Sequence, residues 1–394
     1  MTDPAVQDRR PACTSCHKAK RKCNKNTPAC LRCEKQNILC EYPRQKPTAF
    51  APIDFFGDIF PSEDDFDLAA LDNSFDLLSQ PAMPLITHHT GLSLEPSDRY
   101  SGSWFLEPET WLIDHSTIPI PPNFKMWHLK DFVGRLQKWL EEWVKMGGNC
   151  FIHPELYQDR FPACVQVAFA TLSAYVHRTP ATSDIVMRTV VDQAGELGSS
   201  MKKDSMAKLD VLDILAQAHS LLVYHVIGLL DGDFRARRFF EERCSVFVKL
   251  LGTLHDKSAD TLRQSVLEAE FDDIANGIST PARMVHREWQ AWIVSESVRR
   301  TWLLGTGFHA AYEGLTGGET VCGGDLACTT REGIWEADGA YAWSKLCIEK
   351  DVRFIGRFRA EWLFNMPPSE VDEFSKMMLE ITYGKDRMAL WLAP

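Results

Sequence analysis

Residues 13–40 read CTSCHKAKRKCNKNTPACLRCEKQNILC and contain six of the twelve cysteines of the 394-residue chain. The unit Cys-x2-Cys-x6-Cys begins at Cys13 and returns with the same spacing at Cys30. Clustered cysteines indicate either a disulfide framework or a metal site. The first residues, MTDPAVQDRR, lack the apolar core of a secretion signal, which favours a reducing compartment. We therefore expect this stretch to bind metal.

The number of thiols predicts two metal ions. Two zinc ions with four ligands each need eight coordination positions, which six thiolates fill only if two of them bridge both ions. A single zinc bound by four cysteines is the alternative, but it leaves two thiols of a repeated pattern unused. The six expected ligands are Cys13, Cys16, Cys23, Cys30, Cys33 and Cys40.

Charge divides the chain into parts of opposite sign. Residues 1–50 carry eleven Lys and Arg against four Asp and Glu, although the whole chain has a formal net charge of -11. Residues 51–100 contain ten acidic residues and one basic residue, Arg99. This asymmetry predicts a basic module that binds a polyanion and an acidic remainder with another role.

The positive charge is concentrated in the first of the two x6 gaps. That gap contains His17, Lys18, Lys20, Arg21 and Lys22, whereas in the second gap Glu34 and Lys35 cancel. We expect each half to form a short helix that fills much of its gap, and only the first helix to contact phosphates and base edges of double-stranded DNA. The run from Lys18 to Lys22 is also typical of a nuclear import signal, so we expect the protein in the nucleus.

The cysteine pattern resembles that of the fungal Zn2Cys6 binuclear-cluster transcription factors, over about 30 of the 394 residues. The resemblance implies that Cys13 and Cys30 are the bridging ligands. It also implies that Lys20 reads a CGG-type triplet in the major groove, while Lys18 and Lys22 hold phosphates. Arg21 adds a charge where the family is often apolar, and His17 stands where the family usually has Arg.

Residues 43–123 are rich in proline and acid and show no sustained helical period. The segments DFFGDIF and DDFDLAALDNSFDLL place Phe66, Leu71, Phe75 and Leu78 among carboxylates. We interpret this as an acidic activation segment that folds as a helix in a coactivator groove. A plain acidic spacer and an internal brake on the basic cluster are the alternatives. The pair His88-His89 has no partner ligands, and no metal is expected there.

The sequence contains no clear motif for dimerisation or for membrane binding. The heptad run that often follows the cluster in this family is absent, and prolines at 43, 47 and 52 interrupt any helix there. A homodimer would therefore need another surface, and monomeric binding stays open. Because no apolar run reaches about 20 residues, we expect no membrane partner.

From about residue 124 the pattern changes to long amphipathic segments, which predict an all-α regulatory domain over 124–394. Helices are expected near 126–146, 155–178, 181–200, 206–230, 234–255, 258–276 and 282–313, with weaker ones near 336–350 and 368–384.

The stretch WQAWIVSESVRRTWLLGTGFHAAYEG is the most distinctive part of this domain. At helical spacing Trp289, Trp292, Glu296 and Arg300 share one face, and the last two are four residues apart, as an ion pair requires. We favour a packed aromatic helix with an internal Glu296–Arg300 pair over an effector pocket. The stretch also resembles, more loosely, a pattern in the regulatory domains of many fungal zinc-cluster factors.

Enzyme signatures are incomplete, so we expect no catalytic activity. Gly305-x-Gly307 lacks the third glycine of a dinucleotide loop, and no Lys-Ser or Lys-Thr follows a glycine-rich turn. The remaining cysteines are interpreted as small hydrophobic residues rather than redox sensors. They are Cys150, Cys164, Cys244, Cys322, Cys328 and Cys347.

These observations predict four parts: a disordered terminus over 1–12, a DNA-binding cluster over 13–42, the acidic linker over 43–123 and the helical domain over 124–394. We expect a zinc-dependent, sequence-specific activator of RNA polymerase II genes. The short chain and the compact body also resemble regulators found with fungal secondary-metabolite gene clusters. A DNA-bound repressor or scaffold is one alternative. A helical domain that acts on a small molecule, tethered to DNA by the cluster, is another.

Overall fold

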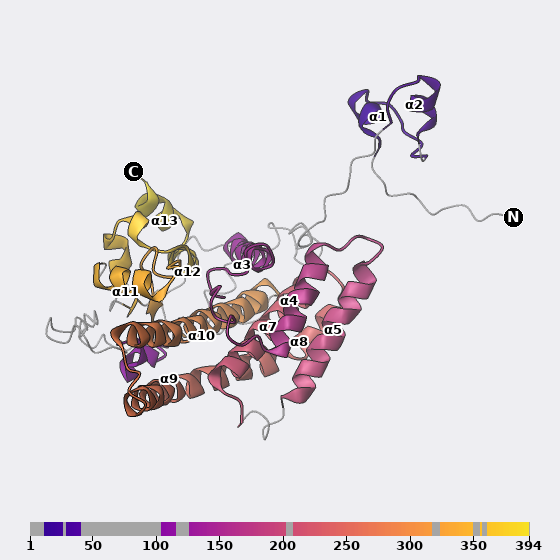
Figure 1. Cartoon of the computed structure of the whole chain (residues 1–394). Helices are drawn as coiled ribbons and strands as arrows, with labels where there is room; N and C mark the ends of the chain where they lie inside the picture. The colour runs from indigo at the N-terminus through magenta and orange to yellow at the C-terminus, as the bar shows by residue number, and fades with distance from the viewer. Residues whose placement is uncertain are drawn as a thin grey trace, which may run out of the picture. The chain divides into compact units, whose positions relative to one another are not determined.

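The computed structural model describes residues 12–26, 29–40, 104–115, 126–201, 208–316, 324–349, 355–356 and 361–393 (Figure 1). The chain divides into two compact units, residues 1–48 and 49–394, and each is described by itself. Several sequence predictions lie outside the described residues. These are the disordered terminus, the activation residues Phe66, Leu71, Phe75 and Leu78, the pair His88-His89, and Cys322.

The second unit is helical, as the sequence predicted. Its longer helices are α3 (Met126–Met146), α4 (Ala163–Val176), α5 (Ser183–Ser200), α7 (Val211–Leu230), α9 (Cys244–Ala275) and α10 (Pro281–Leu315). Its shorter helices are α8 (Phe234–Glu241), α11 (Ala340–Glu349), α12 (Glu373–Tyr383) and α13 (Lys385–Leu392). Two-residue strands, β1 (Cys328–Thr329) and β2 (Ile355–Gly356), pair antiparallel beside them. We call the part of this unit from Trp104 onwards the helical body.

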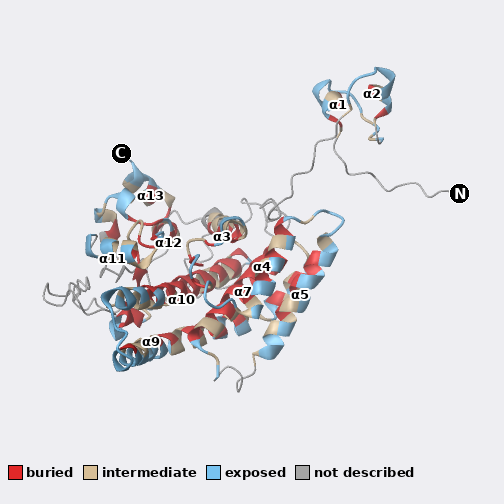
Figure 2. Ribbon diagram, in the orientation of Figure 1, coloured by how far each residue is buried: buried red, intermediate tan, exposed pale blue. Residues whose placement is uncertain are grey.

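Helix α7 lies at the centre of the helical body, where it packs against α4, α5, α8, α9 and α10 (Figure 2). It is long and apolar enough to cross a membrane, but 83% of its most apolar window is buried inside the protein. A helix that is hydrophobic on all sides is typical of such a core position. In the sequence its apolar run is interrupted by Asp213, Gln217, His219 and His225, so it does not read as a membrane span.

Helices α9 and α10 lie side by side and are the two longest helices described in the body (Figure 1). The sequence predicted a break near residues 256–257, but α9 continues through them, because residues 253–275 contain no glycine or proline and Leu254 and Ser258 are buried. Gly305 of α10 permits close packing here, since an added Cβ would lie 2.6 Å from Cδ1 of Leu251.

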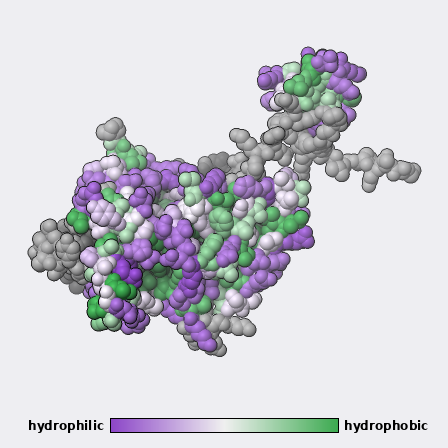
Figure 3. Space-filling view, viewed as in Figure 1, coloured by the Kyte–Doolittle hydropathy of each residue, from purple (hydrophilic) through white to green (hydrophobic). Residues whose placement is uncertain are grey.

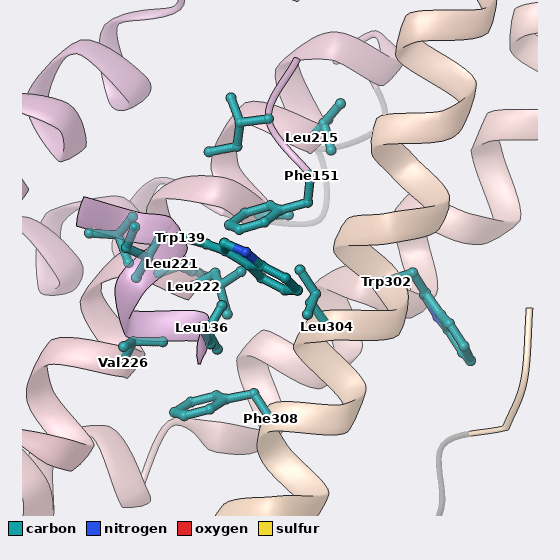
Figure 4. Close-up of a cluster of buried hydrophobic side chains, with 14 of the residues drawn as sticks. Leu136, Trp139, Phe151, Leu215, Leu221, Leu222, Val226, Trp302, Leu304 and Phe308 are labelled. Carbon is teal, nitrogen blue, oxygen red and sulfur yellow. The ribbon is translucent and has the colours of Figure 1, made fainter. Parts of the chain in front are cut away.

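The apolar core joins α3, α7 and α10. Figure 4 shows Leu136 and Trp139 of α3 gathered with Leu222 of α7 and Leu304 of α10. Trp302 points away from this group, and its ring lies 6.1 Å from that of His255 on α9. Side chains on both faces of α10 are therefore buried. Hydrophobic residues still reach the surface in places, among hydrophilic ones (Figure 3).

The predicted linker boundary at residue 123 is wrong, because residues 104–115 belong to the helical body. Phe105 and Trp111 are buried in its core. The guanidinium of Arg299 donates to the Phe105 carbonyl over 2.7 Å and to Oγ1 of Thr110 over 2.8 Å, and it lies 4.1 Å from the centre of the Trp111 ring. The segment forms the 3₁₀ helices η6 (Trp104–Leu106) and η7 (Pro108–Trp111).

The predicted Glu296–Arg300 pair is confirmed, and a second carboxylate joins it. Arg300 Nε lies 3.0 Å from Oε1 of Glu296, and its Nη2 lies 2.6 Å from Oδ2 of Asp372. All three side chains are buried. Burial disfavours the charged guanidinium, but Asp372 and Glu296 hold the pKa of Arg300 above its usual value. Arg300 thereby ties α10 to Asp372, the N-cap of α12.

Replacing Arg300 with Ala is expected to destabilise the helical body by about 3–5 kcal/mol, because it leaves two buried carboxylates without their cation. Arg135→Ala is the matched control. Its pair with Glu380 is partly exposed, so we expect a loss of about 1 kcal/mol or less. Tryptophan fluorescence during denaturant unfolding of the full chain measures both, since every tryptophan lies at or after Trp104. Equal, small decreases in the free energy of unfolding of the two variants would contradict a structural role for the buried cluster of Glu296, Arg300 and Asp372.

Candidate metal centre and nucleic-acid interface

The structure brings the six N-terminal thiols together in two groups of four. One group contains Cys13, Cys16, Cys23 and Cys30, and the other contains Cys13, Cys30, Cys33 and Cys40. Within each group all sulfur atoms lie within 4.8 Å of one another. Cys13 and Cys30 occur in both groups, which is the arrangement that two metals with two shared ligands require.

The sulfur spacing fits tetrahedral zinc. Zn–S bonds of about 2.3 Å place the sulfurs of a tetrahedron about 3.8 Å apart. The Sγ atom of Cys13 lies 3.8 Å from that of Cys30 and 3.6 Å from that of Cys33, and the Cys16–Cys30 distance is 3.6 Å.

The thiol groups need cations to ionise together. Burial raises the pKa of Cys13, and it raises the pKa of Cys33 to about 12. The Cys33 backbone N–H lowers the pKa of Cys30 to about 6. Since desolvation opposes the thiolate forms of Cys13 and Cys33, divalent cations would be needed to hold these two groups ionised beside Cys30.

The two shared cysteines also begin the two helices of this unit. Cys13 is the N-cap of α1 (Thr14–Lys18), and its Sγ accepts the N–H of Cys16 over 3.4 Å. Cys30 caps α2 (Leu31–Lys35) in the same way, accepting the N–H of Cys33 over 3.4 Å. The two halves are therefore pseudo-symmetric, and each contains the short helix that the sequence predicted.

Each helix is shorter than predicted, because a left-handed residue follows it at an equivalent position. Lys20 has φ of 49° after α1, and Asn37, seventeen residues later, has φ of 48° after α2. The N–H groups of Arg21 and Ile38 then bond back to the carbonyls of Cys16 and Cys33, each over 3.0 Å. Asparagine tolerates this conformation, whereas for lysine it costs about 1–2 kcal/mol.

The basic residues of the first half lie on the surface. His17, Lys18, Lys20, Arg21 and Lys22 are all exposed. In the described part of this unit, none of their side chains takes part in an ion pair or a hydrogen bond. Hydrophilic residues also dominate its rim in Figure 3. This surface, the basic face hereafter, can bind an anionic partner.

Two polar contacts of this unit were missed in the sequence analysis. Nη1 of Arg32 lies 3.8 Å from Sγ of Cys16, a metal-facing thiol. The Oδ1 atom of Asn24 accepts the N–H of Leu31 over 3.0 Å, at the first residue of α2. Both residues lie beside or between the cysteines. Nothing else in the sequence indicates that they make these contacts.

The other cysteines are dispersed in the helical body. Cys328 is buried, and Cys150, Cys164, Cys244 and Cys347 are partly buried. Burial raises the pKa of each of these thiols, which disfavours the reactive thiolate. Across the described ranges, the only groups of metal-ligating side chains with suitable spacing are the two in the N-terminal unit.

Comparison with known proteins identifies this unit. Residues 11–49 match the family model described as the fungal Zn(2)-Cys(6) binuclear cluster domain. The N-terminal unit is a fungal zinc-cluster domain. Such a domain binds two zinc ions, in agreement with the two thiol groups of this chain.

Similarity to a curated protein extends beyond the zinc-cluster domain. The chain is 25% identical over 409 aligned residues to "Transcription factor gsfR2" of Penicillium aethiopicum, which covers 97% of this chain and 94% of that protein. The similarity therefore includes the helical body. No solved structure matches the chain.

Sharing of Cys13 predicts unequal effects of two cysteine variants. Cys13→Ser removes a ligand from both thiol groups, so we expect the zinc content of the purified full-length protein to fall from two ions per chain towards none. Cys23→Ser is the matched control, because Cys23 belongs to one group, and it should leave about one ion. Metal analysis under native conditions measures both. Equal loss from the two variants would contradict shared ligation.

Proposed function

We propose that this protein is a zinc-dependent transcription factor that binds specific DNA sequences in the nucleus and activates the genes beside them. The observation that carries this proposal is the difference between the two halves of the cluster. The halves share a backbone, yet four fixed positive charges lie exposed on the first half and the equivalent gap of the second has no net charge. The similarity to a protein named as a transcription factor supports the same function.

The residues of the zinc-cluster domain divide into three roles. We assign the two zinc ions to the six cysteines, with Cys13 and Cys30 as bridging ligands. Lys20 is assigned to the base edges of a CGG-type half-site, because guanine O6 and N7 accept from a lysine in the major groove. His17, Lys18, Arg21 and Lys22 hold phosphates on either side.

The left-handed conformation of Lys20 supports its assignment to base reading. A residue held in an unfavourable backbone conformation marks a position that the surrounding structure fixes, often at a functional site. The turn places the Lys20 side chain just beyond the end of α1, in the exposed gap between Cys16 and Cys23. Asn37, at the equivalent turn of the second half, fits the same backbone without a charge.

The remaining parts complete the proposed regulator. We assign DNA binding to residues 13–42, activation to the acidic segment within 43–103, and regulation to a helical body that begins at Trp104. A single cluster with His17 and Ala19 on its basic face should bind DNA weakly, so tight binding needs two sites or a second copy of the chain. Regulation of a secondary-metabolite gene cluster is the proposed biological role.

Loss of the Lys20 side chain should abolish sequence specificity. Lys20→Gly is the sharpest variant, because glycine accepts the left-handed backbone and keeps the cluster folded. We expect it to weaken binding to a CGG-containing duplex by roughly 1–3 kcal/mol and binding to a scrambled duplex far less. Fluorescence anisotropy with both duplexes measures the difference.

Lys22→Ala is the control for loss of charge alone. It should weaken both duplexes about equally and reduce the slope of log affinity against log salt by about 0.9. If Lys20→Gly also weakens the two duplexes equally, Lys20 does not read bases and the assignment is wrong.

The acidic segment should activate transcription when it is moved to another protein. Residues 50–80, fused to an unrelated DNA-binding domain, should activate a reporter gene. Replacement of Phe66, Phe75 and Leu78 with Ala should abolish this activity, because the apolar side chains supply the contacts to a coactivator groove. An expressed and nuclear fusion that stays inactive would instead favour a spacer and a repressor or scaffold.

A further inference from the structure

A cavity of about 380 Å³ opens between α5, α7, α8 and the start of α9 in the helical body. The same helices lie side by side in Figure 1. Its volume falls within the range of small-molecule sites, roughly 300–1,000 Å³. Apolar side chains form much of its wall. They are Ala194, Leu221, Phe239, Phe240 and Val246, and the other lining residues are Gly195, Gly198, Ser199, His225 and Arg243.

The open space depends on two glycines of α5. Gly195 and Gly198 are three residues apart, so they share one helical face. A Cβ added at Gly198 would meet no atom within 4 Å, and one at Gly195 would meet only Cζ of Phe239, at 3.7 Å. Glycine inside a helix costs about 0.5–1 kcal/mol relative to alanine. A side chain at either position would stabilise α5 and occupy part of the cavity.

The opposite wall is built from closely packed rings. An added Cβ at Gly228 of α7 would lie 1.9 Å from the Phe240 ring, so this ring sits directly against the α7 backbone. The His225 ring stacks on Phe247, with centres 4.8 Å apart, and meets Phe240 edge-on at 5.0 Å. The cavity is therefore a formed feature with a rigid aromatic side.

One fixed positive charge lies in the wall. The Arg243 guanidinium stacks 3.8 Å from the centre of the Phe239 ring, and its Nη1 donates to the Phe239 carbonyl over 3.0 Å. Glu242 lies 3.7 Å from the same nitrogen, in an exposed pair. All polar contacts described for the Arg243 side chain use Nη1, so Nε and Nη2 can donate to a ligand.

His225 adds no charge at neutral pH. Burial lowers its pKa to about 4, although the backbone carbonyls of Leu221 and Arg243 favour the protonated ring. Its Nδ1 lies 2.9 Å from the Leu221 carbonyl, whereas its buried Nε2 makes no hydrogen bond of normal geometry. Arg243 therefore sets the electrostatic preference of the cavity.

We propose that this cavity binds a small aromatic molecule with one anionic group, whose rings pack against Leu221, Phe240 and Val246 while the anion pairs with Arg243. The helical body would then be the ligand-responsive part of the regulator. The acidic segment of this chain has related chemistry, with phenylalanines among carboxylates. A helix with side chains is about 10–12 Å wide, however, and would place no more than a side chain or two in this volume.

Anilinonaphthalene sulfonate tests the proposal, because it is an aromatic anion that fluoresces in apolar sites. Titrated against the full-length protein, it should saturate at one site per chain. Gly198→Leu should abolish that site by filling the cavity while keeping α5 intact. Gly252→Leu is the matched control, since Gly252 also has open space beside it in a helix but does not line the cavity. It should bind the probe like the wild type.

Arg243→Gln tests the charge. It should weaken binding of the sulfonate about fivefold, in keeping with a partly exposed charge-assisted contact. The uncharged analogue phenylnaphthylamine should bind the wild type and this variant equally. Thermal unfolding checks each variant, and Val246→Trp fills the cavity from the other side if Gly198→Leu does not fold.

Three results would overturn the proposal. Undiminished probe binding by both cavity-filling variants would place the probe elsewhere. Equal sulfonate affinity of Arg243→Gln and the wild type would remove the anion site. The third result compares the intact chain with a chain that lacks residues 54–78. If only the shortened chain binds the probe strongly, the acidic segment occupies the cavity in the intact chain.

Discussion

Cys13 and Cys30 belong to both groups of four thiols, and the rest of the zinc-cluster domain is arranged around these two residues. Their sulfurs also accept backbone N–H groups at the starts of α1 and α2. Helices of five residues are far too short to persist alone in water, and the described residues of this unit form no apolar core apart from the cysteines. Metal binding must therefore supply most of its folding free energy.

The same construction determines where the basic face can lie. Since the two cysteines common to both thiol groups are also the N-caps of α1 and α2, each chain segment turns sharply before it reaches its third cysteine. The turns fall at Lys20 and Asn37, in equivalent left-handed conformations. The pseudo-symmetric backbone thus offers two similar positions, and the sequence places a cation at only one of them. Specific DNA binding by one half, which we propose, follows from side chains rather than from a difference in fold.

Local patterns were predictable from the sequence, and contacts between distant residues were not. The repeated cysteine spacing indicated two metals, and the Glu296–Arg300 pair followed from helical spacing. Asp372 was not foreseen, because 72 residues separate it from Arg300. The segment from Trp104 to Trp111 was assigned to the linker on its proline content, although its aromatic residues were a signal for burial. The left-handed turn at Lys20 was not predicted, because lysine has no preference for this conformation. Only the position of Asn37, seventeen residues later in the repeated cysteine pattern, could have indicated the turn.

Shared ligation is the claim on which this account of the zinc-cluster domain depends. Its most direct test is nuclear magnetic resonance of the protein after zinc is replaced by a spin-active cadmium isotope, with the scalar couplings measured between each cadmium and the cysteine β protons. The account predicts two cadmium signals, with the β protons of Cys13 and Cys30 coupled to both and those of the other four cysteines coupled to one. Coupling of every cysteine to a single cadmium, or only one cadmium signal, would contradict it.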